Sequence, residues 1–355
     1  DNFLEFHRTC YHPTNTRIFL YGDIPTEKHL DFLNREFLSR FSGMGPELTI
    51  TAPSSLQVPV HEEKTFPLGE QEDESKRTTL LMSWRFDDSV EPSDRIALEV
   101  LSEILLSNAG SPLRRALVES GLGEDLSPVS GLELDLMVPV FTVGLRGSEG
   151  DRMPEMKKLI ERTLRQLADE GIDVKTRTGA LKRVAFRAQE MDGRGGPFGL
   201  RLMKRLMRGW IYGAEPGRAV SLRPWFEDLE NRLVENPDFF ESLIARLFLA
   251  NQSVGTVVLK PDKNYHEKRK KELRQTIDRI GSEQGQHEGE NSVRENLRCF
   301  QEFQARQDSR EALASIPRLS VDELPAEVQT IDTQEENLAG NVPAYLHHEY
   351  TNKIV

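Results

Sequence analysis

The alternation of apolar and polar residues predicts a strand and then a helix within residues 78–106. Residues 78–86 are mostly β-formers with charged residues on both sides, which is typical of one strand in a half-buried sheet. From Pro92, apolar residues recur with a helical period. Pro is tolerated near the first turn, because the N–H that it lacks would have no partner there. The predicted buried face consists of Ile96, Leu98, Val100, Leu101, Ile104 and Leu105.

A second helix is expected after a short loop at residues 107–110. Ser111 is predicted to be its N-cap, Pro112 its first helical residue and Gly121 the left-handed residue that ends it. Ser111 could also be considered as a nucleophile, but no His stands near it in the sequence to activate it, so the capping role is favoured. The apolar face of this helix is expected to hold Leu113, Leu117 and Val118.

Residues 132–260 contain further segments with the patterns of strands and helices. Residues 132–137 alternate apolar with acidic residues and 139–145 are rich in β-formers, so the two segments are expected to pair in an antiparallel sheet. Asp173 is expected to cap a helix that extends to about residue 191. The order of elements predicts an α+β fold, with an antiparallel sheet packed against helices. The other elements expected here are helices at 153–168, 198–212, 225–233 and 237–249 and a closing strand at 253–260.

The N-terminal region predicts a short strand at Arg17–Tyr21 and a helix at 26–41. A strand with one helix has no sheet of its own to join, so we expect the chain to be a piece of a longer protein. Residues 42–76 are rich in Pro, with an acidic run, and predict an extended linker. The buried face of the helix is expected to comprise Leu30, Leu33, Phe37 and Leu38.

The C-terminal region predicts two charged helices, at 265–281 and 293–305. The Gly- and Gln-rich break at 281–289 favours an antiparallel helical hairpin. Residues 316–344 show no period and are expected to be extended, and 345–355 resemble the approach to a strand.

Composition narrows the classes of partner. Of 355 residues, 37% are hydrophobic and 29% charged, as in a soluble globular protein, and the net charge of −12 argues against general binding of nucleic acid. No apolar run approaches the length of about 20 residues that crosses a membrane. Cys10 and Cys299 have no partner motif and are expected to be free thiols in a reducing compartment or incidental residues. Free cysteines and an acidic composition suit a bacterial cytoplasm.

Candidate metal ligands do not form a known motif. A catalytic zinc site commonly uses a His pair on one helical turn with a nearby Glu. The closest cluster, His347, His348 and Glu349, is expected to be a loop or strand-edge group, because adjacent residues do not share a helical face. None of the eight His residues has the required spacing: His7, His12, His29, His61, His266, His287, His347 and His348.

Other candidate sites also have simpler interpretations. Gly193, Gly195 and Gly196 follow no strand and precede no Gly-Lys-Ser/Thr, so a helix break is favoured over a phosphate loop. An anion site at Lys204, Arg205 and Arg208 is less favoured than a solvated helix face. Core positions are favoured over a ligand platform for Trp84, Trp210 and Trp225. No catalytic, cofactor-binding or metal-binding residue is predicted in this chain.

Four segments resemble the presequence-protease branch of the pitrilysin and insulysin zinc metallopeptidases. They occur in the family's order and span nearly the whole chain: Tyr11–Asp23 (YHPTNTRIFLYGD), Ser111–Gly123 (SPLRRALVESGLG), Lys260–Lys268 (KPDKNYHEK) and Tyr350–Val355 (YTNKIV). The resemblance implies four related α+β domains of the pitrilysin type, in two halves joined by a helical hairpin. They close around a chamber where unfolded peptides are cut. The resemblance also implies zinc held by an inverted His-x-x-Glu-His motif and a later Glu. It would suit an organelle matrix, mitochondrial or plastid, as well as a bacterial cytoplasm.

Mapped onto this family, the chain would contain neither the zinc motif nor the Arg and Tyr that assist the reaction. The resemblance implies the end of the first domain at 1–41, a linker at 42–76, the non-catalytic second domain at 77–262, a helical hairpin at 263–310 and a lead-in to the third domain at 311–355.

The leading hypothesis is a non-catalytic wall and hinge segment of a zinc oligopeptidase, contacting peptide substrate and the other domains of the same polypeptide. The sheet formed by 78–86 and 132–145 is expected to face the chamber. Two alternatives are an interaction or assembly subunit of the same fold and a hydrolase whose site has no recognised motif.

Overall fold

The computed structural model describes residues 2–46, 48–56, 58–86, 92–190, 197–284, 286–324, 330, 332–338 and 342–347. The chain divides into two compact units. The first unit consists mainly of residues 1–66 and 71–262, and the second mainly of 67–70 and 263–353.

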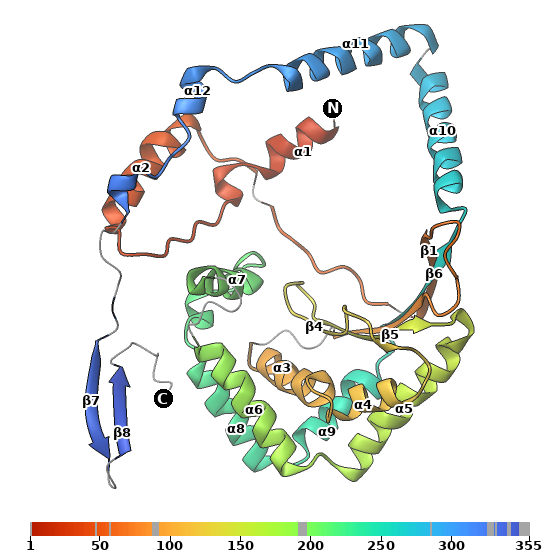
Figure 1. Cartoon of the computed structure of the whole chain (residues 1–355), viewed down its shortest axis with the longest axis vertical. Coiled ribbons are helices and arrows are strands. Elements are labelled where there is room, and N and C mark those ends of the chain that lie inside the picture. Colours follow the sequence, from red (N-terminus) through yellow and green to blue (C-terminus); the bar gives the residue numbers. More distant parts are fainter. Residues whose placement is uncertain are drawn as a thin grey trace. The chain divides into compact units, whose positions relative to one another are not determined.

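A six-stranded sheet organises the first unit (Figure 1). Its strand order is β1-β6-β2-β5-β3, and β4 pairs separately with β5. The central strand β2 is antiparallel to both neighbours, so that Trp84 lies opposite Phe141 on one side and Val254 on the other. The strands are β1 (Val60–Pro67), β2 (Thr78–Arg85), β3 (Asp125–Leu126), β4 (Gly131–Glu133), β5 (Val140–Ser148) and β6 (Val254–Asp262).

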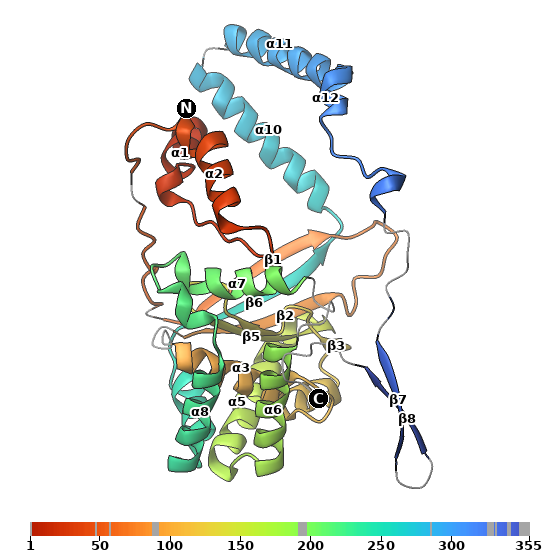
Figure 2. The same cartoon turned by 90° about the vertical axis from the view of Figure 1, so that its left-hand side faces the viewer.

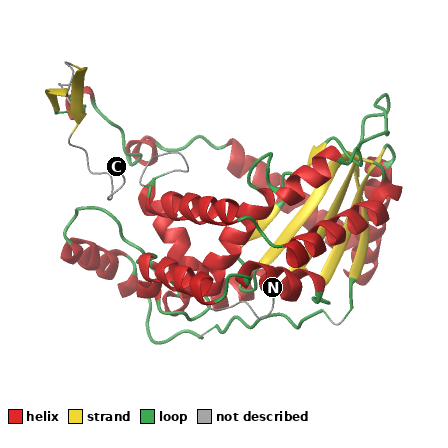
Figure 3. Cartoon of the chain, turned by 90° about the horizontal axis from the view of Figure 1, so that it is seen from below, coloured by secondary structure: helices red, strands yellow, loops and turns green. Residues whose placement is uncertain are grey.

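Helices pack against one face of this sheet. Figure 2 shows α3, α5, α6 and α8 on the same side of β2 and β5, and Figure 3 shows helices crossing the strands when that side is viewed from below. The helices are α3 (Pro92–Leu106), α4 (Pro112–Glu119), α5 (Met153–Glu170), α6 (Val174–Gln189), α7 (Phe198–Trp210), α8 (Arg223–Glu235) and α9 (Phe239–Ile244), which a π-helical turn at Ala245–Leu249 extends. The predicted α+β fold is confirmed.

The core lies between the sheet and the helices. Trp84 is 1% exposed, its ring packs against Phe141 and Phe248, and its indole Nε1 donates to the Phe248 carbonyl at 3.1 Å. The six apolar residues predicted to face inward from the 92–106 helix are all buried. Large aromatic rings bury much apolar area each, so this cluster is a major stabilising part of the unit.

Helix ends follow the sequence signals with one difference. The Asp173 side chain accepts from the Thr176 N–H at 3.0 Å, as predicted for an N-cap. Ser111 occupies the N-cap position of α4, but its buried hydroxyl accepts from the Asn108 N–H at 3.2 Å and makes no capping bond. The hydroxyl turns toward the preceding loop and accepts from that backbone N–H instead of from the first turn of α4. Val118, expected on the buried face of α4, is exposed.

The first 41 residues differ from their prediction. Residues 17–21 form no strand; they lie along α7, where the Tyr21 ring packs against Phe198 with centroids 6.1 Å apart. Helix α2 ends at Glu36 and a 3₁₀ turn follows, and none of its residues is buried. The predicted buried face is therefore wrong: Leu30 and Leu38 are exposed, and Leu33 and Phe37 are half-buried. The elements here are α1 (Asn2–Cys10), η1 (Pro13–Asn15), α2 (Thr26–Glu36) and η2 (Leu38–Arg40).

The segment expected to be an extended linker contains strand β1. It is an edge strand whose residues are almost all exposed, so it carries no apolar alternation that could mark it in the sequence. Polar contacts across to β6 accompany the backbone pairing: His61 Nδ1 lies 2.9 Å from Thr256 Oγ1, and Lys260 Nζ lies 2.8 Å from Glu63 Oε2.

Two other strand predictions need correction. β4 ends at Glu133 instead of reaching residue 137, because the Glu133 carboxylate accepts from the Asp135 N–H at 2.7 Å and turns the chain. In the second unit, β7 (Thr333–Leu338) and β8 (Val342–His347) pair as an antiparallel hairpin. β7 and the start of β8 lie in the stretch expected to be extended, and β8 continues into residues 345–347, where the approach to a strand is predicted. β7 is mostly polar, β8 is mostly apolar without alternation, and nearly all residues of both strands are exposed. Neither strand therefore carries the period-two signal of a half-buried sheet.

The second unit also contains both predicted helices, α10 (Tyr265–Gln284) and α11 (Gln286–Ala305). The predicted break at 281–289 is instead helical on both sides of residue 285. Good helix-formers such as Glu and Gln flank the Gly residues there and outweigh their lower propensity. The remaining short elements are η3 (Gly150–Arg152), η4 (Pro216–Ala219), α12 (Arg310–Ala314) and η6 (Val321–Glu323).

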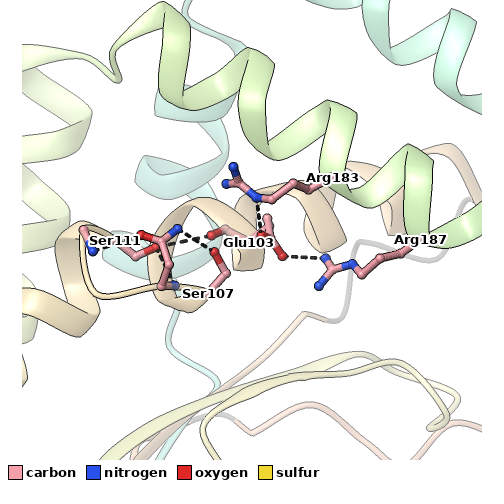
Figure 4. Close-up of polar contacts among 7 residues, drawn as sticks. Glu103, Ser107, Ser111, Arg183 and Arg187 are labelled. Carbon is pink, nitrogen blue, oxygen red and sulfur yellow. Dashed lines mark hydrogen bonds and ion pairs between the residues drawn. The ribbon is translucent and has the colours of Figure 1, made fainter. Parts of the chain in front are cut away.

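An ionic cluster joins α3 to α6. Glu103, 6% exposed, accepts from Arg183 Nε at 2.7 Å and from Arg187 NH2 at 2.5 Å (Figure 4). Burial raises the pKa of the Glu103 carboxyl. Hydrogen bonds from Arg183, Ser107 and Arg187 together outweigh burial and hold that pKa below its ordinary value.

Replacement of Gly144 should destabilise the chain, because a Cβ there would clash with the Leu80 carbonyl oxygen on β2. We expect Gly144→Ala to lower the free energy of unfolding by about 1–3 kcal/mol. At Gly255, also on the sheet, a Cβ would meet nothing within 4 Å. Gly255→Ala should therefore change stability by less than about 1 kcal/mol. Urea unfolding measures both, and equal effects would contradict this account of residue 144.

Glu103→Gln should lower the free energy of unfolding at pH 7 by about 1–3 kcal/mol, since it weakens hydrogen bonds to two guanidinium groups. The pKa of Glu103 in the folded state is below the ordinary value of 4.5. The ionised carboxylate therefore contributes its full stabilisation well above pH 4.5, and this contribution is lost as the pH falls through the folded-state pKa. The difference in free energy of unfolding between the unaltered chain and Glu103→Gln should thus shrink in acid. The exposed pair Arg152–Glu155 supplies a control, because Glu155→Gln should cost less than about 1 kcal/mol at any pH.

Candidate functional site

The side of the sheet opposite the helices carries a mixed apolar and hydroxyl surface. Side chains alternate along β2, so Leu80, Met82 and Trp84 enter the core while their neighbours face the other way and are half-buried. Strand register extends this surface over three strands. We call it the open face and define it by Thr79, Leu81, Ser83, Arg85, Val140, Thr142, Gly144, Gly255, Val257 and Leu259.

The open face has an apolar and a polar part. Leu81 lies between Val257 on β6 and Gly144 on β5. One step along, the Ser83 and Thr142 hydroxyls lie 2.9 Å apart. Such a surface can contact the side chains and backbone of an extended peptide.

Arg85 lies at one end of the open face. Its guanidinium donates to the carbonyl oxygens of Ser54 at 2.7 Å and Pro53 at 2.5 Å, so the segment that precedes β1 passes this end of the sheet. Arg85 is the only ionisable residue in the defined surface. The open face therefore offers contacts for binding, and its Ser83 and Thr142 hydroxyls have no His or carboxylate beside them within the defined surface that could activate them.

Charged side chains gather where α7 meets α3. Arg208 forms ion pairs with Asp135 at 2.5 Å and with Glu99 at 3.5 Å. Burial raises the pKa of the half-buried Glu99 carboxyl, against the opposing effects of Arg208 and Arg205. Burial also lowers the pKa values of the Arg95 and Arg205 guanidinium groups.

This arrangement corrects part of the sequence interpretation. Lys204 is exposed, as expected for a solvated helix face, but Arg205 and Arg208 are half-buried. Both stand on the side of α7 that faces Glu99. The sequence shows that they are one helical turn apart, but it cannot show that α3 supplies a carboxylate opposite them.

The three Trp residues have different positions. Trp84 belongs to the core, as expected. Trp210 and Trp225 are only half-buried, and both line a cavity. An interpretation as core residues is therefore incomplete for these two, because their ring surface also borders open space.

The metal candidates stay apart where the structure describes them. His12 Nδ1 lies 2.9 Å from Thr14 Oγ1, and His347 Nδ1 lies 3.0 Å from Thr333 Oγ1. Within the described ranges, no group of three or more His, Cys, Asp or Glu could hold a metal ion. His348, Glu349 and the three Gly residues at 193, 195 and 196 lie outside those ranges.

Two further predictions can be compared with the structure. Cys10 and Cys299 are both free thiols, as predicted. None of the described helices combines the length and the apolar character needed to span a membrane.

Comparisons with known proteins agree on one family. Residues 1–182 match the family model described as the peptidase M16 inactive domain, and residues 259–355 match the model of the region associated with subfamily C of the M16 peptidases. Protein HypA of Clostridium perfringens is 30% identical over 355 residues, covering all of this chain and 36% of that protein. Presequence protease 1, chloroplastic/mitochondrial, of Arabidopsis thaliana is 29% identical, covering all of this chain and 33% of that protein.

Among solved structures, the peptidase M16 inactive domain from Pseudomonas fluorescens aligns with a TM-score of 0.49 and 16% identity over 68% of this chain and 52% of that one.

The chain spans about a third of the length of Protein HypA and of Presequence protease 1. Because the inactive-domain model covers about half of the chain and the second model its C-terminal region, the chain belongs to the M16 peptidase family, in the presequence-protease-like branch that forms its subfamily C.

Proposed function

We propose that this chain is the wall and hinge part of a zinc-dependent oligopeptidase that cuts unfolded peptides in a closed chamber. The match of residues 1–182 to an inactive domain carries the proposal. The described residues do not fit a zinc site, since they hold no group of three suitable ligands. Zinc and the catalytic residues would then belong to other parts of the same polypeptide.

The open face is the surface that would line the chamber. Its Leu81, Val257 and Leu259 side chains can contact apolar residues of a peptide, and the Ser83 and Thr142 hydroxyls can hydrogen-bond to a peptide backbone. Nonspecific contacts of this kind suit peptides of many sequences.

The proposed division of the chain follows from these roles. Residues 1–41 would end the first domain, 77–262 would form the second, 263–310 would be the hinge and 311–355 would lead into the third. Because β1 pairs with β6, we assign residues 60–76 to the second domain and limit the linker to 42–59. Helices α10 and α11 would give the hinge its length.

The purified chain alone should not cleave a disordered peptide of about 20 residues, because an M16-type reaction requires a metal-bound water. Mass spectrometry of the peptide after incubation with zinc, with and without a chelator, gives the result. Cleavage sensitive to the chelator would show a metal site in this chain and would refute the wall assignment.

In the longer polypeptide, Val257→Gln should raise KM for an unfolded peptide about threefold to tenfold and leave kcat within about twofold, because it weakens binding in ground and transition states alike. Val234→Gln makes the same change on α8, at an 80% exposed site on the helical side of the sheet, and should leave both constants unchanged. If the two variants behave alike, the open face does not contact substrate, and an assembly role becomes the better interpretation.

A further inference from the structure

A cavity of about 370 Å³ lies between α3, α7 and the segment that leads into α8. Its size falls within the range of about 300–1,000 Å³ that is usual for small-molecule sites. It is separate from the open face, and no residue of the defined open face lines it. Three aromatic side chains contribute to its walls: Trp210, Tyr212 and Trp225.

Two of these aromatic residues already use their polar atoms elsewhere. Trp225 Nε1 donates to the Arg218 carbonyl at 3.1 Å, and the Tyr212 hydroxyl donates to the Asp135 carbonyl at 3.4 Å. These bonds fix the orientation of both rings and leave ring carbon to border the cavity. Ile96 and Leu206 add aliphatic surface. The walls can therefore receive an aromatic or branched apolar group.

The cavity also has an excess of positive charge. Four arginines line it, Arg95, Arg205, Arg208 and Arg218, against the carboxylates of Glu99 and Glu215. The Glu215 carboxylate accepts from two backbone N–H groups of the 3₁₀ turn that follows it.

Arg95 and Arg205 are the half-buried arginines best placed for a ligand, because Arg208 already pairs with Glu99 and Asp135 and Arg218 is exposed. Arg95 donates to the carbonyl oxygens of Leu134 at 3.4 Å and Met137 at 3.2 Å, and Arg205 donates to that of Ala188 at 3.1 Å. Neither forms an ion pair with a carboxylate of the described residues. Arg205 also feels the negative charge of Glu99, whose carboxylate is ion-paired with Arg208. Half-buried cations whose hydrogen bonds go to neutral carbonyls favour an incoming anion.

We propose that this cavity binds a small carboxylate with an aromatic or branched apolar body. The carboxylate would pair with Arg95 and Arg205, and the apolar body would pack against Trp210 and Trp225. A cation is disfavoured by the positive excess. A fully hydrated anion such as phosphate would leave the aromatic walls unused.

The probe 3-phenylpropanoate tests the proposal on the whole chain, with 3-phenylpropanamide and inorganic phosphate as comparisons. Tryptophan fluorescence suits the measurement, because two of the three Trp residues line the cavity and Trp84 lies in the core. We expect saturable binding of the carboxylate at least about tenfold tighter than that of the amide. The preference should fall as salt is added, since it rests on charge.

Arg205→Met should weaken binding of 3-phenylpropanoate about fivefold or more and leave binding of the amide unchanged. Lys204→Met removes the same charge from the neighbouring, exposed position on α7 and should have no effect. Arg95→Met should act like Arg205→Met. If Arg205→Met folds poorly, Arg95→Met and the salt dependence of the unaltered chain still test the proposal. Equal affinity for acid and amide, tighter binding of phosphate, or an equal loss in Lys204→Met would each overturn the proposal.

Discussion

The first unit depends on the central position of β2. This strand pairs with β5 on one side and β6 on the other, and its alternate side chains divide the unit into a packed core and an open face. Trp84 shows the consequence most clearly, because its ring packs between strands and the 239–249 helical segment while its N–H satisfies a buried carbonyl. The helices α3, α5, α6 and α8 lie on one side of the sheet, and Leu81 and Ser83 on the other side stay half-exposed and available for contacts.

Charge distribution separates two kinds of arginine in the same layer of helices. Arg183 and Arg187 meet a buried carboxylate and join α3 to α6, so their charges serve the fold. Arg95 and Arg205 meet carbonyl oxygens beside an aromatic cavity. Similar residue types therefore have different roles, and the difference depends on which acceptor α3 and its neighbours place opposite each guanidinium.

The sequence predicted those parts of the fold in which a local pattern coincides with burial. The apolar period of the 92–106 helix and the cap at Asp173 are examples, because each is set by residues within a few positions. β1 could not be predicted, since an exposed edge strand needs no apolar alternation. The cavity was also missed, because its lining comes from segments more than 100 positions apart, and Trp210 and Trp225 look like core residues until their surroundings are known.

The position of β6 has a consequence for how the protein folds. β1 and β2 are close in sequence, yet β6 lies between them in the sheet, and the pairing of His61 with Thr256 spans 195 positions. During synthesis, β2 can pair with β5 while its other edge stays open until the last strand of the unit has been made. Contacts across such long separations slow folding, and an open strand edge can pair with other chains in the meantime. The nascent chain is thus most exposed to misassembly just before residues 254–262 leave the ribosome.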